Sequence, residues 1–168
     1  MIIAIGGCSR SGKTTLAEAL VWHYRNQNKT AVALHQDDFV QKLHDIPLIQ
    51  GRTDWEIPVS IDFEKLSQTV SFYSAHFEVI IVEGLFAFAN ANLNKSYDYG
   101  LFVEISENTF RIRRTVSNRW GAEPAWFLDH VWNSFQKYGQ PASLVLRVSG
   151  EKAYDLKTIT EQLKPKSA

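Results

Sequence analysis

Residues Gly7-Cys8-Ser9-Arg10-Ser11-Gly12-Lys13-Thr14 match the pattern G-x-x-x-x-G-K-[ST] and decide how the chain folds. An apolar run, residues 1–5, precedes this stretch, and a helical pattern follows it. The apolar face of that pattern consists of Leu16, Ala17, Leu20, Val21 and Tyr24. A strand, a glycine-rich turn and a helix in this order form the context that a phosphate-binding loop requires. The sequence therefore predicts that the chain binds a nucleoside triphosphate, and the complete motif argues against a chance glycine turn.

The residue types of this loop indicate how it would hold a phosphate. Glycines let the backbone curl around an anion without a Cβ in the way, and N–H groups at the helix N-terminus attract the β-phosphate. Lys13 is expected to be catalytic because its charge reaches the β- and γ-phosphates, and the Thr14 hydroxyl is a ligand for Mg²⁺. The expected ATP-binding residues of the loop are Gly7, Cys8, Ser9, Arg10, Ser11, Gly12, Lys13, Thr14 and Thr15.

The composition is typical of a soluble globular protein. The chain has 168 residues, with 18 Lys and Arg against 18 Asp and Glu, so no basic excess predicts binding to nucleic acid. Its one cysteine, Cys8, excludes an internal disulfide and suits a reducing cytosol, and we interpret it as a small loop filler rather than a nucleophile. No stretch reaches transmembrane length, and the apolar N-terminus lacks a basic leader, so we expect a cytoplasmic protein without membrane contact.

Strand-like and helix-like runs alternate along the chain, which predicts an α/β fold of the P-loop NTPase type. Expected strands cover residues 1–5, 30–35, 78–83, 99–105 and 144–148. Expected helices follow the loop, cover 61–75 with Ser60 as N-cap, begin near Ser106, carry residues 126–138, and close the chain around 156–163. The result is a doubly wound five-stranded parallel sheet with helices on both faces. We expect one domain over 1–168, with an irregular substrate-binding insert at about 39–60 and a short lid at about 114–127.

Carboxylates follow two of the predicted strands on the side where ligands of such folds gather. Asp37 and Asp38 end the second strand, and Glu83 ends the third. Phosphoryl transfer needs positioning, charge neutralisation and a base for the acceptor hydroxyl. Asp37 could be that catalytic base, and Glu83 could hold a water on the metal. The alternative is structural, with Asp37 capping the next turn and Asp38 solvated.

Four arginines lie on and after the helix that begins near Ser106. Arg111 and Arg114 share a helical face and could point together at a phosphate, because guanidinium groups suit the spread charge of a transferring phosphoryl. We expect Arg113 to be solvated. We expect Arg114 and Arg119 to bind ATP from a lid that excludes water during transfer.

These motifs together resemble the phosphate-loop small-molecule kinases that include uridine kinases and nicotinamide riboside kinases. The shared pieces are residues 7–15, Gln36-Asp37-Asp38-Phe39, Asp54-Trp55-Glu56 with Pro58 and Asp62 following, Ile81-Val82-Glu83-Gly84, and the arginine-rich lid helix. The likeness covers roughly residues 1–138. The segment Asp129-His130-Val131-Trp132, with Lys137-Tyr138 behind it, and the short chain resemble nicotinamide riboside kinases in particular.

The resemblance implies roles for individual residues. Asp37 would accept the proton of a ribose 5′-hydroxyl, Trp55 would stack on the base, and Glu56 would hold the ribose hydroxyls. Thr14 and Glu83 would lie at the Mg²⁺ site, and Arg114 would contact substrate or phosphates. A flat pyridinium cation suits a π-face beside a carboxylate. The chain departs from the family at two places. Glu56 stands where the family generally has Asp, and the predicted lid is shorter than in typical relatives.

A second aromatic partner for the base could be Trp120 or Trp126, whereas we interpret His130 and Trp132 as structural. The sequence thus predicts an ATP- and Mg²⁺-dependent kinase acting on a nucleoside-like small molecule, with nicotinamide riboside as the first candidate. Uridine, cytidine, a sugar or a vitamin precursor is an alternative acceptor. The sequence does not decide whether ATP or GTP is the phosphate donor, or whether the protein is a monomer or a homodimer. A nucleotide-hydrolysing switch is less favoured, because Tyr97 replaces the Asp of N-K-x-D. A regulatory module with lapsed catalysis is the remaining alternative.

Overall fold

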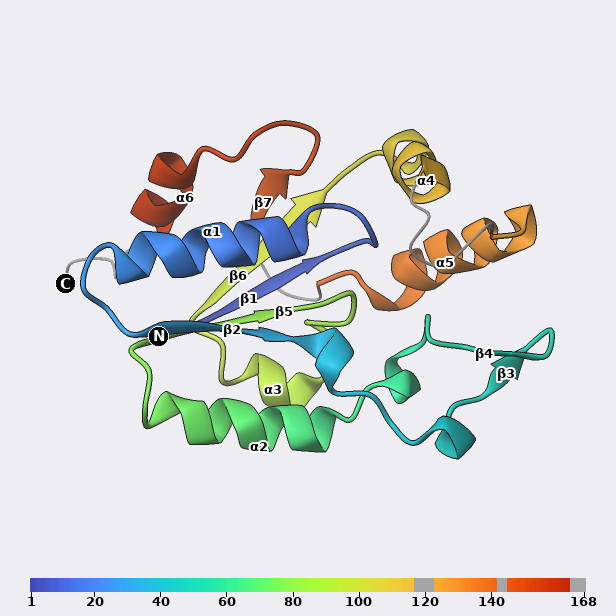
Figure 1. Ribbon diagram of the computed structural model, residues 1–168, viewed down its shortest axis with the longest axis horizontal. Helices are drawn as coiled ribbons and strands as arrows, with labels where there is room; N and C mark the ends of the chain where they lie inside the picture. Colours follow the sequence, from blue (N-terminus) through green and yellow to red (C-terminus); the bar gives the residue numbers. More distant parts are fainter. Residues whose placement is uncertain (117–122, 142–144, 164–168) are drawn as a thin grey trace.

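The computed structural model describes residues 1–116, 123–141 and 145–163, and its ribbon is shown in Figure 1. The strands of the main sheet are β1 (Ile2–Gly7), β2 (Ala31–His35), β5 (Val79–Glu83), β6 (Tyr99–Glu104) and β7 (Leu146–Ser149). The helices are α1 (Lys13–Arg25), α2 (Phe63–Ser74), α3 (Ala91–Asn94), α4 (Glu107–Val116), α5 (Ala125–Tyr138) and α6 (Leu156–Gln162). Leu144, expected to begin the last strand, lies outside the described residues.

The main sheet has five strands in the order β2-β5-β1-β6-β7, and all of its pairs are parallel. Parallel strands joined by helices must be covered on both faces, which explains the continuous apolar run of β5 between β2 and β1. The register pairs Glu83 of β5 with Ile5 of β1 on one side and with His35 of β2 on the other. The predicted doubly wound five-stranded α/β fold is confirmed.

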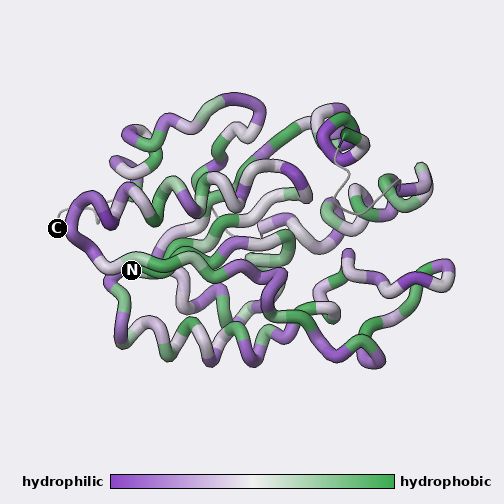
Figure 2. Tube along the Cα trace, viewed as in Figure 1, coloured by the Kyte–Doolittle hydropathy of each residue, from purple (hydrophilic) through white to green (hydrophobic). Residues whose placement is uncertain are grey.

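Helices cover the two faces of the sheet separately (Figure 1). On one face α1 and α6 pack on residues such as Ile5 and Ile81, and on the other α2 and α3 pack on Ile80 and Val82. Because strand side chains alternate between faces, the last residue of β5, Glu83, lies on the same face as Ile81 and α1. Figure 2 shows hydrophobic residues along the central strands, where both layers meet. Helices α4 and α5 lie on the side of the molecule toward which the strands point (Figure 1).

The insert after β2 is more ordered than the sequence predicted. It contains single turns of 3-10 helix at Leu43–Asp45 and Pro58–Ser60, and an antiparallel hairpin of β3 (Leu48–Ile49) and β4 (Arg52–Thr53). A further 3-10 turn, Gln36–Asp38, joins β2 to the insert. At the hairpin tip Gln50 and Gly51 have φ of 48° and 78°. Two consecutive positive φ values are typical of the tight turn that matches the twist of a hairpin.

The N-cap of α2 differs from the prediction. Asp62 caps the helix by accepting a hydrogen bond from the Lys65 amide, at 2.9 Å. Ser60 lies in a preceding 3-10 turn, and its hydroxyl donates to the carbonyls of Trp55 and Ile57 instead. The expectation that Ser60 is the cap was therefore wrong, because its hydroxyl is used to close the insert.

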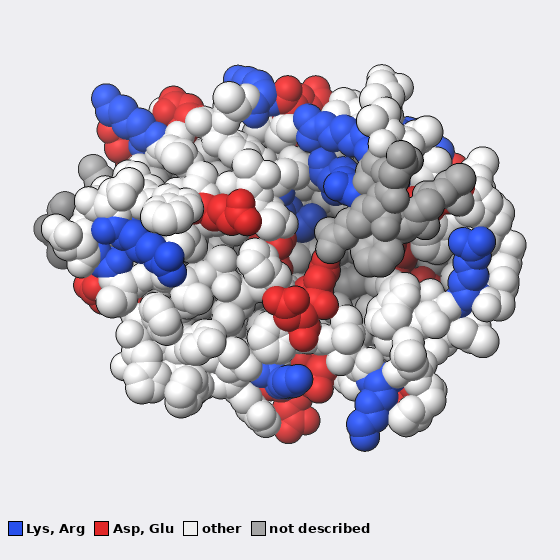
Figure 3. Space-filling view, viewed as in Figure 1, with Lys and Arg blue, Asp and Glu red and all other residues white. Residues whose placement is uncertain are grey.

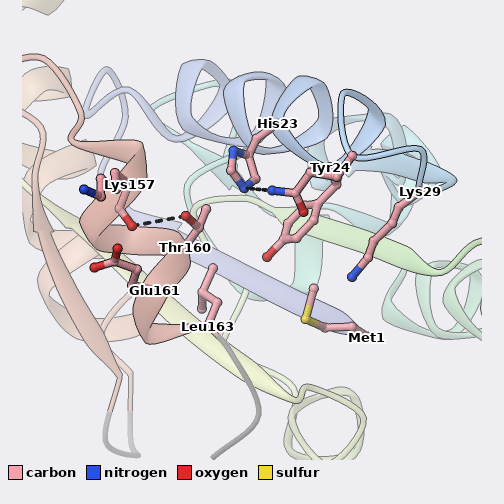
Figure 4. A pocket seen from close by; sticks show the side chains of 9 residues that line it. Met1, His23, Tyr24, Lys29, Lys157, Thr160, Glu161 and Leu163 are labelled. Atoms are coloured by element: carbon pink, nitrogen blue, oxygen red, sulfur yellow. Dashed lines mark hydrogen bonds between the residues drawn. The ribbon is translucent and has the colours of Figure 1, made fainter.

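The amino-terminal edge of the sheet carries a hollow of about 400 Å³, shown in Figure 4. Its lining comes from the start of β1, the end of α1 and α6, and includes Met1, Tyr24 and Leu163. His23 pairs with Gln27 there at 2.9 Å. This hollow lies at the opposite edge from the residues 7–14. No helix within the described residues combines the length and apolar character needed to cross a membrane.

Candidate active site

The stretch 7–14, here called the phosphate loop, joins β1 to α1 at the carboxyl edge of the sheet. Gly7, Arg10 and Gly12 have φ of 145°, 63° and 101°, so the backbone turns repeatedly through conformations with positive φ. Gly12 is the N-cap of α1, and no side chain within the described residues caps this end. Amide groups in the first turn of an uncapped helix are donors for an anion. The loop is therefore shaped to receive a phosphate.

Other parts of the chain brace the loop from outside. The Arg113 guanidinium donates to the carbonyls of Arg10, at 3.1 Å, and Gly150, at 2.8 Å. The Tyr154 hydroxyl donates to the Gly12 carbonyl at 3.0 Å, and a Cβ on Gly12 would lie 2.5 Å from that hydroxyl. The expectation that Arg113 is merely solvated was wrong, because α4 passes over the loop. These bonds occupy the carbonyl side of the loop.

Lys13 and Cys8 interact within the loop. The Lys13 ammonium donates to the Cys8 carbonyl at 2.9 Å, so its side chain folds back over the loop. Cys8 is buried, and burial raises the pKa of its thiol to about 11. A thiol with this pKa stays protonated at neutral pH and is a poor nucleophile. This agrees with the interpretation of Cys8 as a loop filler.

The first turn of α1 is linked to the ends of two strands. Glu83 Oε1 accepts a hydrogen bond from the Thr14 hydroxyl at 2.8 Å and from His35 Nδ1 at 2.9 Å. A hydroxyl beside a carboxylate suits Mg²⁺, which takes its other ligands from phosphates and waters. Among the described residues, no group of three or more His, Cys, Asp or Glu could hold a metal by itself. The donor set therefore fits a magnesium ion that arrives with a nucleotide.

The structure brings the predicted site residues Thr14 and Glu83 together, and it adds His35, which the sequence analysis did not predict. The available signal was its position as the last residue of a strand, directly before Gln36. Gln36 is buried, and its Oε1 accepts a hydrogen bond from the Phe86 amide at 2.8 Å. This bond holds the turn that carries Asp37 and Asp38, which are both exposed at the carboxyl edge of the sheet.

The insert contributes two buried carboxylates on either side of an exposed indole. Asp54 and Glu56 are 7% and 8% exposed, whereas Trp55 is 41% exposed. Asp54 Oδ1 accepts from the Glu56 amide at 3.1 Å and pairs with His130 Nε2 at 2.8 Å. The ring of Trp55 is therefore open to a ligand, and the insert is fastened to α5 by His130. Asp54 is a buried acid that the sequence reasoning left without a role.

Arg114 connects the phosphate loop, Glu123 just before α5, and the insert. Its guanidinium donates to Ser9 Oγ at 2.9 Å, to Glu123 Oε2 at 2.6 Å and to Glu56 Oε1 at 3.4 Å. Burial lowers the pKa of Arg114, but the hydrogen bonds and charges of the two glutamates outweigh burial and raise it. Burial raises the pKa of Glu56, and the Arg114 charge opposes that rise. The guanidinium thus lies between the phosphate loop and the insert.

The remaining arginines do not share this position. Arg111 pairs with Glu107 at 2.7 Å and with Asp129 at 2.6 Å, on an exposed side of α4. The expectation that Arg111 points with Arg114 at a phosphate was wrong, because these carboxylates hold it. Arg119 and Trp120 lie outside the described residues. Trp126 packs edge-on against Phe127.

A second hollow, of about 440 Å³, opens beside the phosphate loop. Its walls come from α1, α4 and the segment between β7 and α6, and they include Thr15, Arg113 and Tyr154. A volume of this size is within the range of small-molecule sites. Figure 3 shows basic side chains in the upper right of one face and acidic ones near its centre.

The fold and this loop define a P-loop nucleotide-binding protein. No protein-family model matches the sequence. The chain is 31% identical to a uridine kinase of Macrococcus caseolyticus, covering 68% of this chain and 67% of that protein. It is 28% identical to human nicotinamide riboside kinase 2, covering 83% of this chain and 68% of that protein.

Solved structures agree on the fold. A possible uridine kinase from Bacillus stearothermophilus has a TM-score of 0.59 at 18% identity, covering 88% of each chain. Shikimate kinase from Aquifex aeolicus has a TM-score of 0.55 at 22% identity, covering 97% of this chain and 96% of that one. The chain belongs to the family of P-loop small-molecule kinases that contains uridine kinases and nicotinamide riboside kinases. It is a phosphotransferase that acts on an alcohol group.

Proposed function

We propose that this kinase transfers the γ-phosphoryl group of ATP to the 5′-hydroxyl of a ribonucleoside, and that nicotinamide riboside is converted to nicotinamide mononucleotide. The observation that carries the proposal is the Arg114 guanidinium, which contacts Ser9 of the phosphate loop and Glu56 of the insert. One side chain therefore spans the distance between a phosphate site and a buried carboxylate suited to ribose hydroxyls. Positioning two reactants in this way is the main catalytic requirement of phosphoryl transfer.

ATP would occupy the phosphate loop through its β- and γ-phosphates. The first-turn amides of α1 would donate to the phosphates, and Lys13 would leave the Cys8 carbonyl to neutralise the charge that develops on the γ-phosphoryl. Thr14 and Glu83 would hold Mg²⁺, which supplies charge neutralisation between the phosphates when bound. The nucleoside part of ATP would extend into the hollow beside Thr15 and Tyr154.

Asp37 would act as the base. Its carboxylate would accept the proton of the 5′-hydroxyl as that oxygen bonds to the γ-phosphorus. The bond from phosphorus to the β–γ bridging oxygen breaks, and its electron pair leaves with ADP. Asp37 suits this role because the turn after β2 exposes it at the same sheet edge as the phosphate loop.

The insert would recognise the nucleoside. Trp55 would stack on the base with its exposed indole, and Glu56 would accept hydrogen bonds from the ribose hydroxyls. The neighbouring Asp54 adds a second carboxylate, and two carboxylates near a π-face favour a cationic pyridinium over a neutral pyrimidine. The Glu56 carboxylate would also discriminate against acceptors that lack the hydroxyls, because such acceptors add no hydrogen bond to its 3.4 Å contact with Arg114.

Uridine or cytidine is the second candidate acceptor. The 31% identity to a uridine kinase favours it, although that alignment covers less of the chain than the alignment with human nicotinamide riboside kinase 2. A nucleotide switch is disfavoured by local structure as well. Asn94 and Tyr97, at the positions of the guanine motif, donate to the carbonyls of Phe88 and Ala87 and so stabilise the fold.

The test is a coupled assay of ADP release with nicotinamide riboside, uridine, cytidine, pantothenate and simple sugars as acceptors. We expect nicotinamide riboside to give the highest kcat/KM and its 5′-phosphate to accumulate in step with ADP. Faster turnover with uridine or cytidine would show that a pyrimidine nucleoside is the acceptor, and it would leave the proposed nucleoside kinase activity intact. ADP release that no acceptor accelerates would contradict the proposal.

A further inference from the structure

His35 and Glu83 occupy the final rung of the ladder between β2 and β5. The parallel register makes them direct partners, so their side chains leave the sheet on the same face. That face is covered by α1, whose first turn contains Thr14. The contact between His35 and Glu83 is therefore built by strand pairing rather than by a chance meeting of two surface side chains.

The hydrogen bonds at Glu83 use one of its two carboxylate oxygens. Oε1 accepts from Thr14 Oγ1 at 2.8 Å and from His35 Nδ1 at 2.9 Å. A carboxylate oxygen has two lone-pair sites, so these two donors fill Oε1. No hydrogen bond formed among the described residues uses Oε2. The carboxylate is thus held with a defined oxygen left for another partner.

The same arrangement orients the hydroxyl of Thr14. Because the hydroxyl hydrogen is donated to Glu83, the lone pairs of Thr14 Oγ1 are directed away from the carboxylate. An oxygen must present a lone pair to bind a cation, so a hydroxyl held in this way is ready to ligate a metal. The Glu83 side chain is 8% exposed, which limits the alternative rotamers that could undo this orientation.

We propose that His35 is a positioning residue for the Mg²⁺–nucleotide complex: by donating to Oε1 it keeps Glu83 Oε2 and the Thr14 lone pairs turned toward the metal. This inference rests on the proposed kinase function. Groups that hydrogen-bond to metal ligands fix the orientation of those ligands, and their removal typically lowers metal affinity 10- to 100-fold. His35 itself does not touch substrate or metal in this role.

The experiment measures binding of Mn²⁺ to the protein–ADP complex by electron paramagnetic resonance. Variants are His35→Ala, which removes the donor, and His35→Asn, whose amide nitrogen can replace Nδ1. His23→Ala is the matched control, since His23 lies beside the hollow at the opposite edge of the sheet (Figure 4). Binding of ADP in EDTA and the melting temperature are measured for each variant to detect a general structural loss.

We expect His35→Ala to weaken Mn²⁺ binding about tenfold or more, with ADP binding in EDTA unchanged. His35→Asn should recover most of the affinity, and His23→Ala should behave as wild type. Equal Mn²⁺ affinity in His35→Ala and wild type, or equal losses in His35→Ala and His35→Asn, would overturn the role of His35. Loss of ADP binding in EDTA together with a lower melting temperature would also overturn it, in favour of a structural role. Failure of the kinase proposal is seen separately, as wild-type protein without acceptor-dependent ADP release.

Discussion

The phosphate loop and the insert meet at one edge of the sheet, but they are constructed differently. The loop is a contiguous stretch whose backbone we propose as the phosphate-binding surface, and Arg113 and Tyr154 hold it from outside. The insert would bind the acceptor through side chains, and its acidic groups pair with residues from elsewhere, including His130 of α5 and Arg114 of α4. A site made of backbone groups can be predicted from one short sequence motif. A site made of side chains from distant elements can be recognised only once the fold has brought those elements together.

This difference predicts that damage to the two halves separates into distinct kinetic effects. Changes in the phosphate loop should reduce the rate of transfer, and changes in the insert should reduce affinity for the acceptor. Changes at Asp37, the proposed base, should reduce turnover without changing affinity for either substrate.

The largest expected effect is that of Lys13→Ala. Removing the ammonium takes away charge stabilisation in the transition state, so kcat should fall by roughly a thousandfold. Acceptor affinity, measured by calorimetry, should stay near the wild-type value because the insert is intact. Near-normal turnover in a folded Lys13→Ala protein would show that the loop does not bind a transferring phosphate.

Asp37→Asn should have the next largest effect. Loss of a general base typically costs about a hundredfold or more in rate, while the affinity for ATP should be nearly unchanged. Asp38→Asn, one residue along the same exposed turn, is the matched control and should keep its activity. Comparable losses in both variants, accompanied by a lower melting temperature, would indicate that the turn is structural.

Trp55→Ala tests the insert itself. If the indole stacks on the base, the variant should bind the nucleoside about tenfold more weakly, since such contacts contribute on the order of 1–2 kcal/mol. kcat at saturating acceptor should change little. Trp22→Ala, which removes a 63% exposed indole from α1, is the control and should not alter nucleoside affinity. An unchanged KM in Trp55→Ala would place base recognition elsewhere.

The smallest expected effect concerns Cys8 and the packing of the phosphate loop. Burial raises the pKa of the thiol from 9.0 to about 11, so the folded chain holds this proton more tightly than the unfolded chain. The associated stability is present below pH 9 and is lost as the pH rises toward 11.

At about pH 10 the loss should be about 1 kcal/mol relative to neutral pH. Urea unfolding of wild type and Cys8→Ala at both pH values isolates this difference from other titrating groups. A parallel decline in the two proteins would mean that the thiol is more accessible to solvent than the packing indicates.

Much of the fold could be predicted because each apolar run is bounded by strong turn signals. The run that ends at Glu83-Gly84 and the one that ends at Gln36-Asp37 both proved to be strands of the main sheet. The order of strands could not be derived, since alternation along the chain does not encode which strands are neighbours. For the same reason His35 was missed, because its partner Glu83 is adjacent only through strand pairing.

The arginines of α4 show a similar limit. Helical periodicity correctly puts Arg111 and Arg114 on neighbouring turns, yet it cannot say how α4 lies over the loop. In the folded chain the consecutive residues Arg113 and Arg114 both reach the phosphate loop, through Arg10 and Ser9. Helical periodicity predicts which residues share a face of a helix, whereas tertiary packing determines which residues that face contacts.

The hairpin tip at Gln50 and Gly51 is exposed. Exposed tight turns tolerate inserted residues, so a short fluorescent tag could be placed at this tip without interrupting the strand ladders of the main sheet. Because the tip belongs to the same insert as Trp55, such a tag would report whether the insert changes its position when an acceptor is added.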